Sequence, residues 1–167
     1  AIVEAEPAGP VTYNGVTYTD IRVCSNGYIW LGPVAGAADF SPTEAELLAQ
    51  APRICPMWTD LNPGAAGSGQ VYYDASVPGV AKITWAGVFQ YNTTNQNSVQ
   101  VVIDASSSVT VTYGPCTTAA NPIVGASPGV GSISNPVSLA TRPVVITQNN
   151  FAQVVTAAAG TPFVYSN

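Results

Sequence analysis

Glycine, proline and asparagine divide this chain into many short apolar runs, and that spacing limits the folds that it can adopt. The 167 residues include 15 Gly and 14 Pro, so few stretches are long enough for the helices of a bundle. Hydrophobic residues make up 47% of the chain and charged residues 8%, which is too apolar for a disordered polypeptide. We predict a single all-β domain over residues 1–167, built as an antiparallel sandwich or a flattened barrel.

The turn residues indicate where strands begin and end. Residues 11–13 and 16–18 flank Asn14-Gly15, a pattern that predicts a hairpin with a type I′ turn. Residues 21–24 and 28–31 flank residues 25–27, which fits either a second hairpin or one strand kinked at a glycine. Further strands are predicted at 54–61, 70–74, 81–88, 98–104, 108–113, 123–126, 143–147, 151–156 and 163–165.

One short helix is predicted at about residues 42–50. Ser41 is the expected N-cap, with Pro42 at the first helical position and Glu44 completing a capping box. Pro52 ends the helix. A different proline, Pro56, lies inside the apolar run 54–61. Because proline donates no hydrogen bond to a sheet, its position there favours an edge strand or a bulge.

Charge and residue types exclude several classes of function. The net charge is −5, with only four Lys and Arg residues, so no basic patch is available to neutralise nucleic-acid phosphates. The chain contains no His, which removes His-based triads and the most common general base. It opens at Ala1 and has no apolar run of 18 residues, so we expect an exported, extracellular chain with no membrane span.

Three cysteines allow one disulfide and one free thiol. Cys24, Cys55 and Cys116 can pair in three ways that the sequence does not separate. We favour a Cys24–Cys55 disulfide, because both residues lie in apolar runs that are expected to form neighbouring core strands. The alternative is three unpaired thiols.

Asp60 and Asn62 are the candidate metal ligands. They are two positions apart and precede Gly64, which resembles the beginning of a calcium-binding loop. The alternative is an Asx-type turn, in which these side chains accept hydrogen bonds from nearby backbone N–H groups. Ca²⁺ is therefore a possible ligand by sequence, and no other cofactor is indicated.

Carboxylates are the remaining candidates for catalysis. A glycoside hydrolase would need two of Asp60, Asp74 and Asp104 close together. Asp74 and Asp104 lie beside turns, where a solvated or turn-capping carboxylate is the more common arrangement. Lys82 is expected to point to water, which leaves a serine nucleophile without a base. We predict no catalytic residues.

The adjacent aromatic pair Tyr72-Tyr73 is the candidate binding site. Neighbouring residues of a strand point to opposite faces of its sheet, so one of these two rings must point outward. An exposed aromatic ring can stack on a sugar or anchor a protein partner. Most other aromatic residues are expected in the core.

An ordered set of motifs resembles a known family. The segments are SNGYIWLG (25–32), APRICPMWTDLNP (51–63), GQVYY (69–73), ITW (83–85), SVQVVI (98–103), VTYG (111–114) and VGASPG (124–129). Together they resemble the extracellular nidogen-like (NIDO) domain over about residues 20–130. The resemblance implies a secreted, non-catalytic, β-rich module of matrix and adhesion proteins, and it implies no catalytic residues.

These observations favour a secreted binding module that acts in adhesion or in self-assembly into a surface layer, matrix or filament. The chain has few of the charged residues that protect sheet edges, so we expect edges that pair with another subunit. Segments 1–10 and about 143–167 are candidates for such contacts, with copies of the chain or other extracellular proteins as partners. The alternatives are a glycan-active hydrolase and a calcium-dependent carbohydrate-binding module.

Overall fold

The computed structural model describes residues 2–5, 9–33 and 38–129, together with four short strands near the C-terminus. The strands are β1 (Ile2–Ala5), β2 (Val11–Tyr13), β3 (Val16–Tyr18), β4 (Ile21–Cys24), β5 (Tyr28–Leu31), β6 (Arg53–Trp58), β7 (Gln70–Asp74), β8 (Ala81–Phe89), β9 (Gln96–Ile103), β10 (Val109–Cys116), β11 (Ile123–Ser127), β12 (Val137–Ser138), β13 (Val145–Thr147), β14 (Gln153–Thr156) and β15 (Phe163–Ser166). The helix α1 spans Glu44–Ala49. Within these described residues, no helix is long and apolar enough to cross a membrane.

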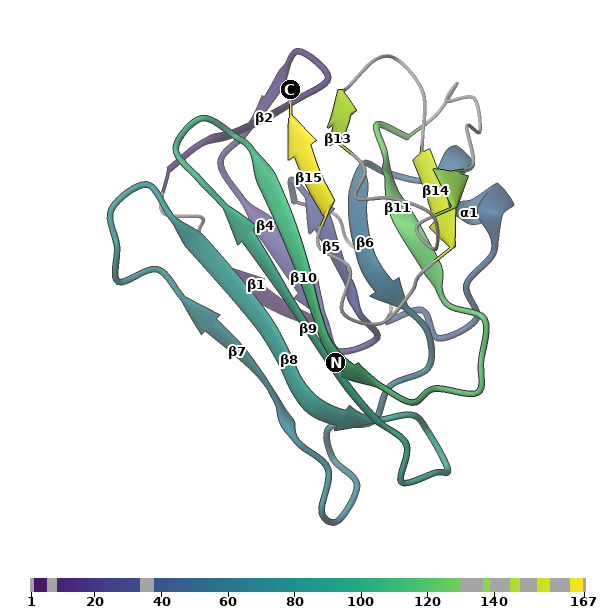
Figure 1. Cartoon of the computed structure of the whole chain (residues 1–167). Helices are drawn as coiled ribbons and strands as arrows, with labels where there is room; N and C mark the ends of the chain where they lie inside the picture. The colour runs from purple at the N-terminus through teal and green to yellow at the C-terminus, as the bar shows by residue number, and fades with distance from the viewer. Residues whose placement is uncertain are drawn as a thin grey trace.

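The strands form two large sheets that pack face to face as a sandwich (Figure 1). One sheet has seven strands in the order β1-β4-β5-β6-β11-β14-β12, and the other has six in the order β13-β15-β10-β9-β8-β7. Neighbouring strands are antiparallel, except that β12 with β14 and β13 with β15 are parallel. A separate hairpin joins β2 and β3. The all-β prediction is confirmed, and of its two forms the structure is the sandwich.

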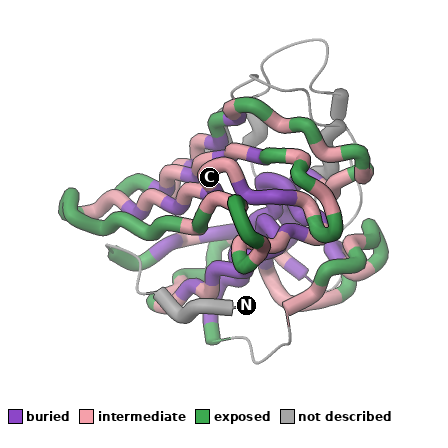
Figure 2. Tube along the Cα trace, turned by 90° about the horizontal axis from the view of Figure 1, so that it is seen from below, coloured by how far each residue is buried: buried purple, intermediate pink, exposed green. Residues whose placement is uncertain are grey.

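The main core lies between the two sheets, where buried residues gather in Figure 2. β9 and β10 alternate as predicted, with Val99, Val101 and Ile103 buried on one and Val109, Val111 and Tyr113 buried on the other. Two hydrogen-bonding side chains also link the sheets across this core. Trp85 Nε1 donates to the carbonyl of Ser25 at 3.1 Å, and the Tyr113 hydroxyl donates to the carbonyl of Pro56 at 2.6 Å.

The seven-stranded sheet also buries residues on its other face. A second cluster there contains Cys24, Tyr28, Trp30, Leu47, Cys55 and Trp58. Leu47 comes from α1, so the helix covers this outer face. As a result, all six residues of β6 are buried.

Pro56 lies at an irregular point in β6, although β6 is a central strand. The register with β11 shifts between the pairs Gly125↔Cys55 and Ile123↔Trp58. This shift places Met57 in the main core, while Cys55 and Trp58 both lie in the outer cluster. The sequence predicted either an edge strand or a bulge at Pro56, and the bulge is confirmed.

Turn chemistry explains the predicted hairpins. Asn14 and Gly15 have φ values of 49° and 75°, as a type I′ turn requires, and they join β2 to β3. Residues 25–27 join β4 to β5 as a second hairpin, which resolves the alternative that the sequence left open. Gly27 has a φ of 78°, and a Cβ there would lie 2.0 Å from the Met57 carbonyl oxygen. Only glycine fits this close approach.

The helix begins later than predicted. Its N-cap is Thr43, whose side chain accepts from the backbone N–H of Glu46 at 3.1 Å and donates to the Glu46 carboxylate at 2.6 Å. The capping box is thus Thr43 with Glu46, and the expected box of Ser41 with Glu44 is wrong. Both pairs have the same spacing, so the sequence pattern alone fits two starting points.

The strands of both terminal segments pair within the chain. β1 pairs with β4 over four residues, β14 pairs with β11, and β15 pairs with β10. The segments proposed from sequence for contacts between subunits thus contribute strands to the chain's own sheets. Two of these strands, β1 and β13, are also the outermost strands of their sheets, as β7 is at the other end of the six-stranded sheet.

Candidate functional site

The exposed strand β7 carries the two tyrosines that the sequence singled out. It is the last strand of the six-stranded sheet, beside β8 (Figure 1). Tyr72 is aligned with Thr84 and lies on the outer face, whereas Tyr73 is aligned with the buried Ile83 and lies on the core-facing side. Tyr72 is 58% exposed and Tyr73 is 39% exposed. The two rings thus point to opposite faces, and the edge position leaves both accessible.

The outer face of the six-stranded sheet is polar and lightly charged. Tyr72, Thr84, Gln100 and Thr112 follow one another across four neighbouring strands. The Gln100 amide donates to the Thr84 hydroxyl at 2.8 Å. Lys82 lies next to Asp74, with 3.5 Å between Nζ and Oδ2, and is partly exposed as predicted. This face offers polar and aromatic contacts with little charge.

The three candidate catalytic carboxylates lie apart. Asp74 aligns with Lys82 and Val102 across β8 and β9, and Asp104 follows two residues after Val102. Strand spacing and rise then place the Cα atoms of Asp74 and Asp104 about 12 Å apart. The backbone carbonyl of Asp60 accepts from the N–H of Tyr91, which lies beyond the other end of β8. Asp60 is therefore roughly 25 Å from Asp74 and Asp104. The separation of Asp60 from the other two exceeds the roughly 9.5 Å that the carboxyl groups of an inverting pair allow.

The surroundings of these carboxylates are those of turn residues. Hydrogen bonds from Ser76 lower the pKa of Asp74, with a further contribution from Lys82. Hydrogen bonds from Ser106 and Ser108 lower the pKa of Asp104. Both groups are thereby stabilised as anions that hold local turns, which is unlike a general acid. Partial burial raises the pKa of Asp60.

Asn62 forms the turn that was the alternative to a calcium loop. Its side-chain oxygen accepts from the backbone N–H of Gly64 at 3.0 Å, as in an Asx turn. The backbone N–H of Asn62 donates to the carbonyl of Phe89 at 2.8 Å. Across the described residues, no three Cys, Asp or Glu side chains come together as metal ligands. Ca²⁺ binding by Asp60 and Asn62 stays a prediction, with the Asn62 oxygen already engaged.

Arg53 forms a buried centre that the sequence analysis did not identify. The residue is fully buried, and its Cζ atom lies 4.1 Å from the ring centroid of Trp30 and 4.2 Å from that of Trp58. Nη2 donates to the carbonyl of Glu46 at 2.7 Å and to the side chain of Gln50. Nε and Nη1 have no hydrogen-bond partner in the described structure. Burial lowers the pKa of Arg53.

The segment at residues 38–43 is fixed over this centre by its backbone. Asn26 Nδ2 donates to the carbonyl of Asp39 at 2.8 Å, and Trp58 Nε1 donates to the same carbonyl at 3.2 Å. The N–H of Asp39 donates to the Tyr28 hydroxyl at 2.9 Å. Tyr28 and Trp58 of the seven-stranded sheet and Asn26 of its β4–β5 turn thus hold one residue of the segment. The Arg53 centre is consequently closed, and its geometry is that of a structural core.

The predicted Cys24–Cys55 disulfide is not present in the structure. Cys24, Cys55 and Cys116 are all free cysteines in the structure. β5 lies between β4 and β6, and Cys24 is aligned with Tyr28 of that strand. Two strand spacings separate the Cα atoms of Cys24 and Cys55 by roughly 10 Å, whereas a disulfide needs at most about 7 Å. β5 lies between these two strands both along the chain and in the sheet.

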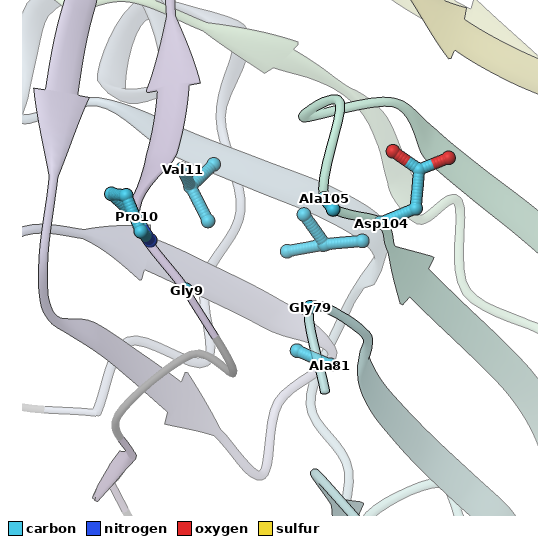
Figure 3. Close-up of a pocket in the computed structure, with 8 residues that line it drawn as sticks. Gly9, Pro10, Val11, Gly79, Ala81, Asp104 and Ala105 are labelled. Carbon is cyan, nitrogen blue, oxygen red and sulfur yellow. The ribbon is translucent and has the colours of Figure 1, made fainter. Parts of the chain in front are cut away.

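A small pocket lies at one end of the sandwich. It is lined by Gly9, Pro10, Val11, Gly79, Ala81, Ile103, Asp104 and Ala105 and has a volume of about 110 Å³ (Figure 3). Sites for drug-sized ligands usually measure about 300 Å³ or more. The Asp104 carboxylate points away from the space between Val11 and Ala105 (Figure 3). This pocket therefore presents small apolar groups rather than a reactive one.

The stacking of Arg53 predicts that lysine cannot replace it. Arg53→Lys keeps the charge, but an ammonium group cannot stack flat against two indole rings while donating to two acceptors. We expect a loss of about 2 kcal/mol or more of unfolding free energy in denaturant titrations. Lys82→Arg, on the exposed outer face, is the control and should change stability little. Equal stability of the two variants would contradict the proposed role of the stacking.

The free cysteines predict a specific thiol count. Burial raises the pKa of the Cys55 thiol to about 12, and it also raises the pKa of Cys24 and Cys116. In the folded protein near neutral pH, we expect a thiol reagent to modify the half-buried Cys116 slowly and the other two hardly at all. After unfolding without a reductant, all three should react. A count of one in the unfolded protein would show that a disulfide forms.

Comparison with known proteins adds to this geometry. No curated protein and no solved structure was found to match the chain. A family model described as NIDO related matches residues 10–166. The match includes the β2–β3 hairpin and the C-terminal strands, so it extends past the region of about residues 20–130 that the motifs indicated. Nidogen-like domains are generally extracellular. The chain belongs to the NIDO-related family.

Proposed function

We propose that this chain is a non-catalytic extracellular module that works by surface contact, in adhesion or in self-assembly. The observation that carries the proposal is the exposed edge strand β7, which presents Tyr72 and Tyr73 to solvent. Exposed tyrosines are common anchors of protein interfaces because each supplies a large ring and a hydroxyl group. Membership of the NIDO-related family supports the extracellular setting.

The described carboxylates support a role without catalysis. Asp74 and Asp104 are engaged by serine side chains and backbone N–H groups of their own turns. The buried Arg53 is covered by α1 and by the segment at residues 38–43. We place the contact with a partner on the outer face and the β7 edge of the six-stranded sheet. Copies of the chain and other extracellular proteins are the proposed partners.

Self-assembly is tested first by the mass of the purified chain in solution. We expect the mean mass from sedimentation velocity to rise reversibly as protein concentration increases, because a short exposed strand gives a small and weak interface. Electron microscopy at the highest concentration would show whether the complexes are closed or extended. A chain that stays monomeric at every concentration, with no particles in the images, would contradict self-assembly.

A further inference from the structure

The outer edge of β7 has a defined set of unpaired backbone groups. The N–H of Gly69 donates to the carbonyl of Gly87 at 3.0 Å, one register step before the pair Gln70↔Ala86. In an antiparallel ladder, hydrogen-bonded and non-hydrogen-bonded pairs alternate. Val71 and Tyr73 therefore bond to β8. The backbone groups of Gln70, Tyr72 and Asp74 point away from β8, toward the open edge.

This edge lacks the features that usually prevent pairing between molecules. The register of β7 with β8 runs without interruption over five pairs, so no bulge turns the strand away. The strand contains neither proline nor lysine, and Asp74 is its one carboxylate. That carboxylate lies 3.5 Å from Nζ of Lys82. An exposed, regular and nearly uncharged edge is a template for another strand.

We propose that β7 pairs antiparallel with β7 of a second copy of this chain, about a two-fold axis at Tyr72. The inference rests on the self-assembly part of the proposed function. In this register Tyr72 is opposite Tyr72 of the second copy, and Gln70 is opposite its Asp74. These are the residues whose backbone groups point outward, so every outward N–H and C=O of the strand gains a partner. The two six-stranded sheets become continuous across the axis.

The side chains favour a second copy as the occupant of this edge. In the proposed register the Gln70 amide can donate to the Asp74 carboxylate of the second copy. Val71 is opposite Tyr73 of the second copy, which is an aromatic and β-branched pair of the kind that stabilises antiparallel strands. Tyr72 meets its own equivalent on the outer face. The strand is thus complementary to itself about its central residue.

Disulfide trapping tests the register. Cys116→Ser removes the half-buried native thiol, and Val71→Cys and Tyr73→Cys are then made in separate chains. Residues 71 and 73 of two copies form a non-hydrogen-bonded pair in the proposed register, with Cα atoms about 4.5 Å apart, which suits a disulfide. We expect a mixture of the two variants to form disulfide-linked dimers under mild oxidation, several times more than either variant alone. Equal yields in all three samples would overturn the register.

A proline substitution tests the edge itself. Tyr72→Pro removes an N–H that points away from β8, so the fold should tolerate it at this edge position. We expect it to weaken association at least tenfold by sedimentation. The control is Tyr91→Ser, which removes a tyrosine that is 50% exposed and lies outside β7. Circular dichroism checks that each variant is folded. Tyr72→Lys is a second variant, and it should also weaken association because it places like charges opposite each other at the two-fold axis.

These outcomes separate the two proposals. If the wild-type chain associates and both Tyr72 variants associate equally well, the β7 pairing is overturned while self-assembly stands. If the wild-type chain does not associate at all, self-assembly is overturned and the pairing falls with it. Loss of association in the Tyr72 variants but not in Tyr91→Ser supports the pairing.

Discussion

The guanidinium of Arg53 lies between two indole rings on a strand whose six residues are all buried. This burial needs cover on both faces of the seven-stranded sheet. One face packs on the six-stranded sheet, and the other is closed by α1 and by the segment that Asn26, Tyr28 and Trp58 hold in place. A partner therefore cannot use the outer face around β6. The outer face of the six-stranded sheet and its edge β7 stay accessible to a partner.

Local chemistry explains which parts of the fold the sequence could predict. Asn14-Gly15 specifies a turn with positive φ at two residues, so these two residues are enough to predict the first hairpin. The alternation in residues 98–113 likewise identifies the buried faces of β9 and β10. The helix cap was missed by two residues because Ser41 and Thr43 each precede a glutamate at the same spacing. Periodicity and turn residues thus locate elements better than they locate element ends.

Strand order depends on contacts between distant residues, and here the sequence was insufficient. The disulfide prediction assumed that the strands of Cys24 and Cys55 are neighbours, but β5 separates them. The Arg53 centre was missed for a related reason, since Trp30, Arg53 and Trp58 meet only after β5 and β6 pair. For the candidate site, Tyr72-Tyr73 could be identified from period-2 geometry. The position of β7 at the edge, which exposes both rings, could not.

Amide hydrogen exchange along β7, followed by NMR at low and high protein concentration, tests the central claim most directly. In dilute solution the amides of Val71 and Tyr73 should be protected by β8, while those of Gln70, Tyr72 and Asp74 exchange freely. At high concentration the account predicts slower exchange for these three amides and no change for the other two. Exchange that stays equally fast at Gln70, Tyr72 and Asp74 when the protein is concentrated would contradict pairing at this edge.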